Sequence, residues 1–165
     1  ILCSSFSKSL SRDLRIGWVN GGRWQDKIIR LKLTSQLASG QLQQLAVAEF
    51  MANGHFKRHL HSFKSSLLLH RNQLLSALLQ YGPCAIKYSL PQGGLALWVE
   101  FSQEINTTKL YSTALKKNIV LTPGQLFSSA GHFSNSMRIR YNPQYTGQRL
   151  NALKQIINPD MCQGL

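Results

Sequence analysis

Hydrophobic and polar positions follow a helical period in the first half of the chain and a mixed pattern in the second half. In three segments, apolar residues recur at spacings of three and four, which is typical of amphipathic helices. These segments are residues 23–36, 41–52 and 55–81. The third ends at Gly82-Pro83, a pair that does not continue a helix. The pattern therefore predicts a helical middle region with a sharp end.

The residues before these helices predict two strands joined by a polar loop. Residues 1–3 (Ile-Leu-Cys) have the composition of the end of a buried strand, and residues 4–13 form a loop rich in serine. Residues 14–19 are expected to form a second strand, which stops at the Asn-Gly-Gly turn of residues 20–22. The long helix that follows later carries an apolar stripe, and the members of this stripe from Phe56 to Leu78 are expected to pack on a strand region at residues 95–101. The stripe consists of Phe56, Leu60, Phe63, Leu67, Leu74, Leu78 and Tyr81.

After residue 82, short apolar segments alternate with turn residues and predict a unit that contains both helices and strands. Strands at 84–90 and 95–101 are expected to flank a hairpin turn, Pro-Gln-Gly-Gly, at 91–94. The remaining expected elements are a helix at 107–117, strands at 119–121 and 137–141, and an amphipathic helix at 146–157.

Composition and charge narrow the class of protein. The 165 residues are 43% hydrophobic, which supports a packed core, and no apolar run approaches the length of a membrane span. The three cysteines form no CxxC pair, so neither a disulfide framework nor a cysteine zinc site is predicted, which fits a cytoplasmic setting. The formal net charge is +13. Because the chain begins with Ile1 and shows no signal peptide, we expect it to be cut out of a longer protein.

The serine-rich loop holds the densest group of polar side chains. Lys8 lies among hydroxyl groups, and Arg15 follows seven positions later at the expected second strand. A lysine beside cationic and hydroxyl groups is neutral more often, which makes its amine a nucleophile toward carbonyls. An arginine together with serine hydroxyls suits an anionic phosphate. On spacing alone, a solvated basic loop explains the same residues.

This loop also resembles a known segment. Residues 5–8 (Ser-Phe-Ser-Lys) and 14–18 (Leu-Arg-Ile-Gly-Trp) look like the Schiff-base segment of fold type I pyridoxal-phosphate aminotransferases. They are most similar to the aminotransferase-like domain of MocR-type, GntR-family transcription regulators. The resemblance implies that Lys8 forms a Schiff base with pyridoxal 5'-phosphate. The cofactor-binding residues assigned on this basis are Ser5, Ser7, Lys8 and Arg15.

Four later segments agree with the resemblance in their order. Residues 55–79 are similar to the family's long basic helix, and residues 91–100 look like its Pro-x-Gly-Gly hairpin. Residues 120–127 look like its Pro-Gly-x-x-Phe segment, and residues 137–141 resemble the strand whose arginine clamps the substrate carboxylate. The resemblance therefore covers essentially the whole chain.

The carboxylate clamp has two candidates. The resemblance implies Arg138, whereas Arg140 stands where the family usually has a small residue and is the alternative. A strand has a period of two, so both side chains should point to the same face. A guanidinium forms bidentate pairs with carboxylates, which is the physical reason for an arginine at either position.

The implied fold class is α+β. Residues 1–54 are expected to be the C-terminal end of the α/β, pyridoxal-phosphate-binding large domain. Residues 55–165 are expected to be the small C-terminal domain with its long connecting helix, an antiparallel sheet with helices on one side. In the family the other cofactor ligands come from upstream sequence, so this segment alone is expected to be inactive.

Two functions are implied. The first is a pyridoxal-phosphate-binding effector domain of a GntR/MocR-family transcription regulator, with an amino acid or amine as ligand. The alternative is a class I/II amino-acid aminotransferase, in which Lys8 also moves the proton at the substrate's α-carbon. The resemblance further implies DNA binding through an upstream winged-helix domain, and a homodimer, whereas no membrane partner and no metal are predicted.

Three weaker signals point elsewhere. Residues 5–8 also match the Ser-x-x-Lys motif of penicillin-recognising enzymes, but neither Ser-Asp-Asn nor Lys-Thr-Gly occurs in the chain. His55 and His59 have the spacing of a helical zinc pair, whereas a solvated helix face explains them as well. The excess of basic residues suits nucleic acid, although no interleaved aromatic platform and no helix-turn-helix accompanies it.

Overall fold

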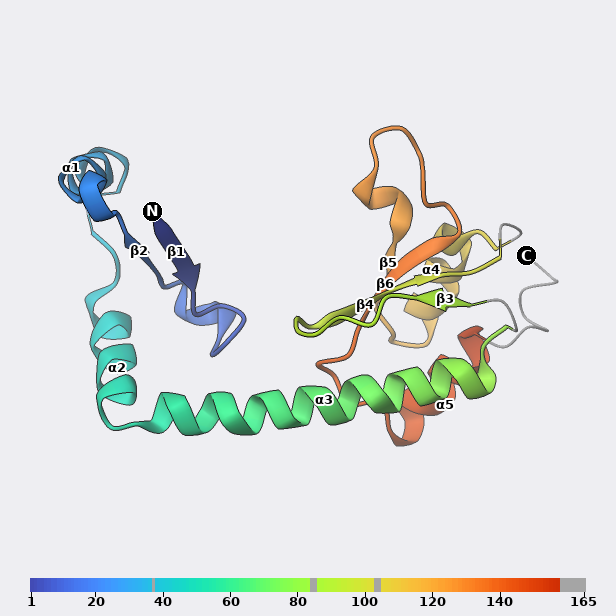
Figure 1. The fold of residues 1–165 in the computed structure, drawn as a ribbon. Helices are drawn as coiled ribbons and strands as arrows, with labels where there is room; N and C mark the ends of the chain where they lie inside the picture. Colours follow the sequence, from blue (N-terminus) through green and yellow to red (C-terminus); the bar gives the residue numbers. More distant parts are fainter. Residues whose placement is uncertain (37, 84–85, 103–104, 158–165) are drawn as a thin grey trace. The chain divides into compact units, whose positions relative to one another are not determined.

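The computed structural model describes residues 1–36, 38–83, 86–102 and 105–157 (Figure 1). The chain divides into two compact units, Ile1–Phe63 and Lys64–Leu165, and each is described by itself. The long helix α3 (His55–Tyr81) contributes residues to both units. Its bounds agree with the sequence prediction, because the apolar spacing and the Gly82-Pro83 end are local signals. The domain boundary expected after residue 54 stays a prediction.

The first unit opens with a two-stranded antiparallel ribbon. Strand β1 (Leu2–Ser5) pairs with β2 (Gly17–Asn20), with Ser5 opposite Gly17. Between them lies the 3-10 helix η1 (Arg12–Leu14). A second 3-10 helix, η2 (Gly22–Trp24), then leads into the helices of this unit. They are α1 (Gln25–Ser35), α2 (Gln41–Ala52) and the start of α3.

Three expectations for this ribbon were wrong. Strand β1 is exposed along its whole length rather than buried, because it belongs to a ribbon of only two strands. The polar loop is shorter than residues 4–13, since Ser4 and Ser5 join the strand ladder. The second strand begins at Gly17 rather than residue 14, because Arg15 turns the backbone into the left-handed region after η1.

The second unit is built on a four-stranded antiparallel sheet of order β3-β4-β6-β5. Its strands are β3 (Lys87–Tyr88), β4 (Ala96–Glu100), β5 (Thr122–Pro123) and β6 (Ser136–Arg140). The 3-10 helix η3 (Gly124–Phe127) follows β5. Helices α4 (Thr107–Lys116) and α5 (Gly147–Ile157) complete the unit and agree with the predicted segments.

The core of the second unit lies on one face of this sheet. Alternate residues of the two central strands are fully buried, as a period of two requires. They pack in one cluster with apolar residues from α3, α4 and α5. The cluster includes Leu74, Leu78, Leu97, Val99, Leu110, Ala114, Met137, Ile139, Leu153, Ile156 and Ile157. The expectation of an antiparallel sheet with helices is therefore confirmed.

The stripe of the long helix does not act as one surface. Leu74 and Leu78 belong to the core of the second unit, and Leu67 and Tyr81 are partly buried against it. Phe56, however, contacts Phe6 in the first unit, with ring centroids 5.7 Å apart. A single helix face thus serves two packing partners, so the prediction that the stripe from Phe56 to Leu78 packs as a whole on the strand region at 95–101 was wrong.

Two predicted strands differ from the structure. Residues 119–121 form no strand, because Asn118 takes a left-handed conformation (φ 56°) and Ile119 N–H donates to the Ala114 carbonyl at 2.9 Å. These groups end helix α4 and are not available to a sheet ladder. The strand expected at 84–90 is reduced to β3, and residues 84–85 lie outside the described ranges. Within the described residues, no helix has the length and apolar composition needed to cross a membrane.

Candidate functional site

The loop between β1 and β2 carries four of the predicted site residues. Its start is fixed by Phe6, which is 8% exposed and whose N–H donates to the Ile16 carbonyl at 3.0 Å. The Ser5 hydroxyl accepts from the Ser7 N–H at 3.1 Å and lies 2.9 Å from the Ser7 hydroxyl. The Leu10 N–H donates to the Phe6 carbonyl at 2.8 Å and closes the turn. The structure thus brings Ser5 and Ser7 together and leaves Lys8 exposed in the turn.

Gly17 is required where the two ends of this loop meet. A Cβ atom at this position would lie 2.7 Å from the Ser4 carbonyl oxygen. Because that atom belongs to the backbone of the paired strand, it cannot move aside without opening the ladder. The glycine of the Gly-Trp pair in the sequence motif is therefore required by the close approach of the two strands.

Arg15 lies in an unusual backbone conformation at the end of η1. Its φ of 51° places it in the left-handed region, which is costly for a residue with a Cβ atom. Strain of this kind persists where surrounding structure imposes it and is concentrated at functional sites. The neighbouring Arg12 instead has a regular conformation and lies 4.0 Å from the Asp13 carboxylate. The two loop arginines are therefore distinct.

The donor set of this loop fits an anionic phosphate. Lys8 and Arg15 are exposed, and neither forms an ion pair with any described carboxylate. Ser5 and Ser7 add two hydroxyl groups, so every side chain of the set can donate a hydrogen bond. Cationic and hydroxyl donors without an acidic partner suit a phosphate group, and an exposed lysine amine can react with an aldehyde. The residues present thus fit pyridoxal phosphate in their chemistry.

An apolar groove of about 700 Å³ borders the same loop. Residues of β2 and of helices α2 and α3 line it together with the loop. Its apolar lining includes Phe6, Ile16, Trp18, Val47, Met51 and Phe56. Sequence reasoning did not identify this groove, although Val47 and Met51 stand four apart on α2 and so share one helix face.

The histidine pair on α3 has contacts that differ from both sequence interpretations. No group of three potential metal ligands occurs in the described part of the chain. The His55 ring stacks on Phe50 at 5.6 Å, and its Nδ1 lies 2.8 Å from the Arg58 guanidinium. His59 is half-buried, and its Nε2 lies 2.9 Å from the Ser9 carbonyl. His59 is thus not part of a purely solvated face, and sequence spacing alone gave no signal for its contact.

The two predicted clamp residues lie in the second unit. Arg138 and Arg140 are both exposed and alternate with the buried Met137 and Ile139, so they share one face of β6 as predicted. The Arg138 guanidinium lies 5.1 Å from the centre of the Phe127 ring, within range of a cation–π interaction.

The surroundings of the two clamp candidates differ. The Arg138 guanidinium also lies 3.4 Å from the Thr122 hydroxyl, whereas Arg140 Nε donates to the Asn142 side chain at 3.0 Å. The Arg140 carbonyl accepts from the Tyr145 hydroxyl at 3.0 Å, and burial raises the pKa of that phenol. Arg140 is therefore tied into the end of its strand, and Arg138 faces an aromatic ring with no described carboxylate beside it.

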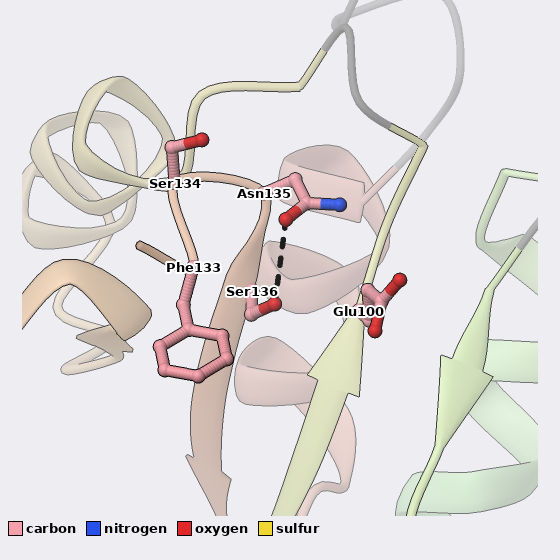
Figure 2. Close-up of a pocket in the computed structure, with 5 residues that line it drawn as sticks. All are labelled: Glu100, Phe133, Ser134, Asn135 and Ser136. Atoms are coloured by element: carbon pink, nitrogen blue, oxygen red, sulfur yellow. Dashed lines mark hydrogen bonds between the residues drawn. The ribbon is translucent and has the colours of Figure 1, made fainter. Parts of the chain in front are cut away.

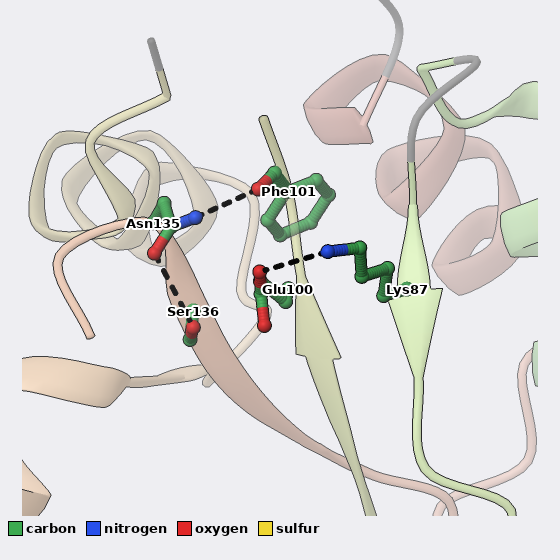
Figure 3. A network of polar contacts seen from close by, with 5 residues as sticks. All are labelled: Lys87, Glu100, Phe101, Asn135 and Ser136. Atoms are coloured by element: carbon green, nitrogen blue, oxygen red, sulfur yellow. Dashed lines mark hydrogen bonds and ion pairs between the residues drawn. The ribbon is translucent and has the colours of Figure 1, made fainter. Parts of the chain in front are cut away.

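A second cavity in this unit is polar and holds none of the predicted site residues. It measures about 390 Å³ and is lined by Glu100 and residues 133–136 (Figure 2). Asn135 Nδ2 donates to the Phe101 carbonyl at 2.8 Å, and Lys87 lies 3.8 Å from Glu100 (Figure 3). These contacts join the ends of β3, β4 and β6, and the exposed ion pair contributes little stability. The polar groups of this cavity therefore connect the ends of neighbouring strands.

The sequence of this chain is similar to those of known proteins. The sequence matches the family described as aminotransferase class I and II over residues 1–157. The uncharacterized HTH-type transcriptional regulator YjiR of Escherichia coli is 33% identical over 158 residues, covering 94% of this chain and 33% of that protein. The uncharacterized HTH-type regulator YdcR of the same organism is 32% identical over 154 residues, covering 93% and 33%.

A solved structure shares the fold. The crystal structure of the α-aminoadipate aminotransferase LysN of Thermus thermophilus, complexed with N-(5'-phosphopyridoxyl)-L-leucine, has a TM-score of 0.83 at 25% identity. The match covers 98% of this chain and 42% of that one. This chain belongs to the class I and II aminotransferase family, and its curated relatives include HTH-type regulators of the kind its sequence resembles. It spans about a third of the length of the curated relatives it matches.

Proposed function

We propose that this chain is part of the aminotransferase-like effector domain of a GntR/MocR-type transcription regulator that binds pyridoxal 5'-phosphate. The observation that carries the proposed binding of pyridoxal phosphate is the loop between β1 and β2. It carries Lys8 and Arg15, neither of which forms an ion pair with a described carboxylate, in the same segment as the Ser5 and Ser7 hydroxyls. The similarity to two HTH-type regulators over more than nine-tenths of the chain supports the regulator.

In this proposal each loop residue has one role. Lys8 would hold the cofactor aldehyde as a Schiff base, because its amine is exposed and forms no ion pair with any described carboxylate. The Arg15 guanidinium and the Ser5 and Ser7 hydroxyls hold the phosphate. When bound, the cofactor supplies an electron sink for the ligand's α-carbon. Residues 1–54 then form the end of the cofactor-binding large domain, and residues 55–165 form the small domain.

Arg138 is proposed to bind the carboxylate of an amino-acid ligand. Its guanidinium lies against Phe127 and has no described carboxylate partner, so it can pair with a ligand. Arg140 is the weaker candidate, because Asn142 already occupies its Nε. In a regulator, ligand binding favours one of two conformations. That change of conformation then alters DNA binding by a separate HTH domain. A homodimer is proposed for the full-length protein.

A class I/II amino-acid aminotransferase is the second candidate. The structural similarity to an α-aminoadipate aminotransferase at a TM-score of 0.83 favours it. In this function Lys8 has a second role, because its amine also moves the proton between the ligand's α-carbon and the cofactor. The residues proposed for the cofactor and the carboxylate stay the same, so the loop geometry does not separate the two functions.

The experiment uses the full-length protein. Pyridoxal phosphate is added, the absorbance of the Schiff base is recorded, and the linkage is reduced with borohydride before peptide mapping. We expect the label on Lys8 and its loss in Lys8→Arg, which keeps the charge but forms no ordinary imine. Label on another lysine contradicts the assignment. Ligand-dependent DNA binding without turnover of amino acids supports the regulator, whereas turnover with 2-oxo acids supports the aminotransferase.

A further inference from the structure

One side chain from a distant part of the first unit holds the loop that carries Lys8. His59 Nε2 lies 2.9 Å from the carbonyl oxygen of Ser9, the residue directly after Lys8. A carbonyl oxygen only accepts hydrogen bonds, so Nε2 carries the hydrogen in this contact. The partners are fifty positions apart in the sequence, and helix α3 supplies the histidine. The contact thus fixes the loop to helix α3.

The His59 ring is itself held by aromatic neighbours. It stacks on Phe63 with ring centroids 5.6 Å apart and planes 12° apart. Its other neighbour is Phe50 of α2, which it meets edge-on at 6.4 Å. The ring is half-buried between these two side chains, so its orientation toward the Ser9 carbonyl is set before any cofactor binds. Little conformational freedom is then lost when the hydrogen bond forms.

The turn has a second anchor on the other side of Lys8. Phe6 is buried against Phe56, and its N–H and carbonyl take part in backbone hydrogen bonds. After Lys8, the described contacts are the Leu10 N–H bond back to Phe6 and the bond from His59 to Ser9. Lys8 therefore lies between one apolar anchor and one histidine anchor, and its backbone position depends on both.

We propose that His59 is a positioning residue for Lys8. By donating to the Ser9 carbonyl, it keeps the turn of residues 6–10 in the conformation in which the Lys8 amine and the Ser5, Ser7 and Arg15 donors serve one cofactor. This inference rests on the proposed function of the loop and adds a residue to it that contacts neither cofactor nor ligand.

The test compares three variants of the full-length protein. His59→Leu removes the donor and keeps an apolar side chain between the two phenylalanines. His59→Gln places an amide N–H at a reach similar to Nε2 and should restore the bond. His55→Leu is the matched control, because His55 also stacks on Phe50 from the same helix but has no described contact with the loop.

Two measurements are made on each variant. The affinity for pyridoxal phosphate is titrated through the absorbance of the Schiff base. Amide hydrogen exchange is measured over residues 6–10 without cofactor. For His59→Leu we expect an affinity about 3- to 10-fold lower, which corresponds to one hydrogen bond. We also expect faster exchange in this turn and unchanged exchange in the central strands β4 and β6.

The outcomes distinguish failure of the proposed role of His59 from failure of the proposed function of the loop. Recovery in His59→Gln together with wild-type behaviour in His55→Leu supports the inference. Wild-type affinity and wild-type exchange in His59→Leu overturn it, as does a His59→Gln variant as weak as His59→Leu, since ring packing would then be responsible. If the wild-type protein forms no Schiff base at Lys8, the proposed function fails instead, and the exchange data alone report whether His59 fixes the turn.

Discussion

Replacing Arg15 by glycine should separate the stability of the loop from its binding of pyridoxal phosphate. Arg15 has a φ of 51°, and this conformation costs a residue with a Cβ atom about 1–2 kcal/mol. Glycine relieves that strain but gains freedom in the unfolded chain, which costs about 0.5–1 kcal/mol. The free energy of unfolding should therefore stay equal or rise by up to about 1.5 kcal/mol.

Cofactor binding should change in the opposite direction. The guanidinium has no described carboxylate partner, so its full capacity is available to a phosphate. Losing a hydrogen bond to a charged group costs about 1.5–3 kcal/mol, which corresponds to a roughly 10- to 150-fold weaker affinity. Arg12→Ala is the control, because Arg12 and Asp13 form an exposed pair with a separation of 4.0 Å. That pair contributes little, and its loss should leave cofactor affinity unchanged.

The assay combines chemical denaturation of the full-length protein, followed by circular dichroism, with titration of pyridoxal phosphate. Arg15→Gly should give an unfolding midpoint at or above that of the wild type and a clearly weaker titration. Arg15→Lys keeps the positive charge but not the planar guanidinium, so its cofactor affinity should lie between those of the wild type and Arg15→Gly. Equal affinities for Arg15→Gly and Arg12→Ala refute the reasoning. A joint loss of stability and affinity in Arg15→Gly also refutes it, because the left-handed residue would then be a structural requirement.

Three further predictions concern the second unit. Leu97→Ala, at a fully buried position of the central strand β4, should lower the free energy of unfolding by about 2–5 kcal/mol in denaturant titrations. Burial raises the pKa of Tyr145, so ionisation of this phenol opposes folding. The stability should therefore be full below a pH of about 10 and fall as the pH rises further. In thermal scans, Tyr145→Phe should reduce that fall. Phe127→Ala should weaken binding of an amino-acid carboxylate, since the ring no longer supports Arg138, whereas the same substitution should leave the affinity for pyridoxal phosphate unchanged.

Local patterns in the sequence determined much of this protein. The bounds of α3 follow from apolar residues at helical spacing and from the glycine and proline that end it, and both signals act within a few residues. The alternation on β6 likewise placed Arg138 and Arg140 on one exposed face, because side-chain direction in a strand depends only on position parity. Family membership could also be inferred, since residues 5–8 and residues 14–18 each form an unbroken sequence motif.

Only the tertiary structure decided how these elements are used. Residues 119–121 have the composition of a strand, but the Ile119 N–H completes the end of α4. The apolar stripe of α3 is continuous in sequence, yet Phe56 and Leu78 pack in different units. The left-handed conformation of Arg15 and the bond from His59 to Ser9 have no local pattern at all. The bond from His59 to Ser9 arises because folding brings together groups that are fifty positions apart in the chain, and spacing along a sequence does not encode such a contact.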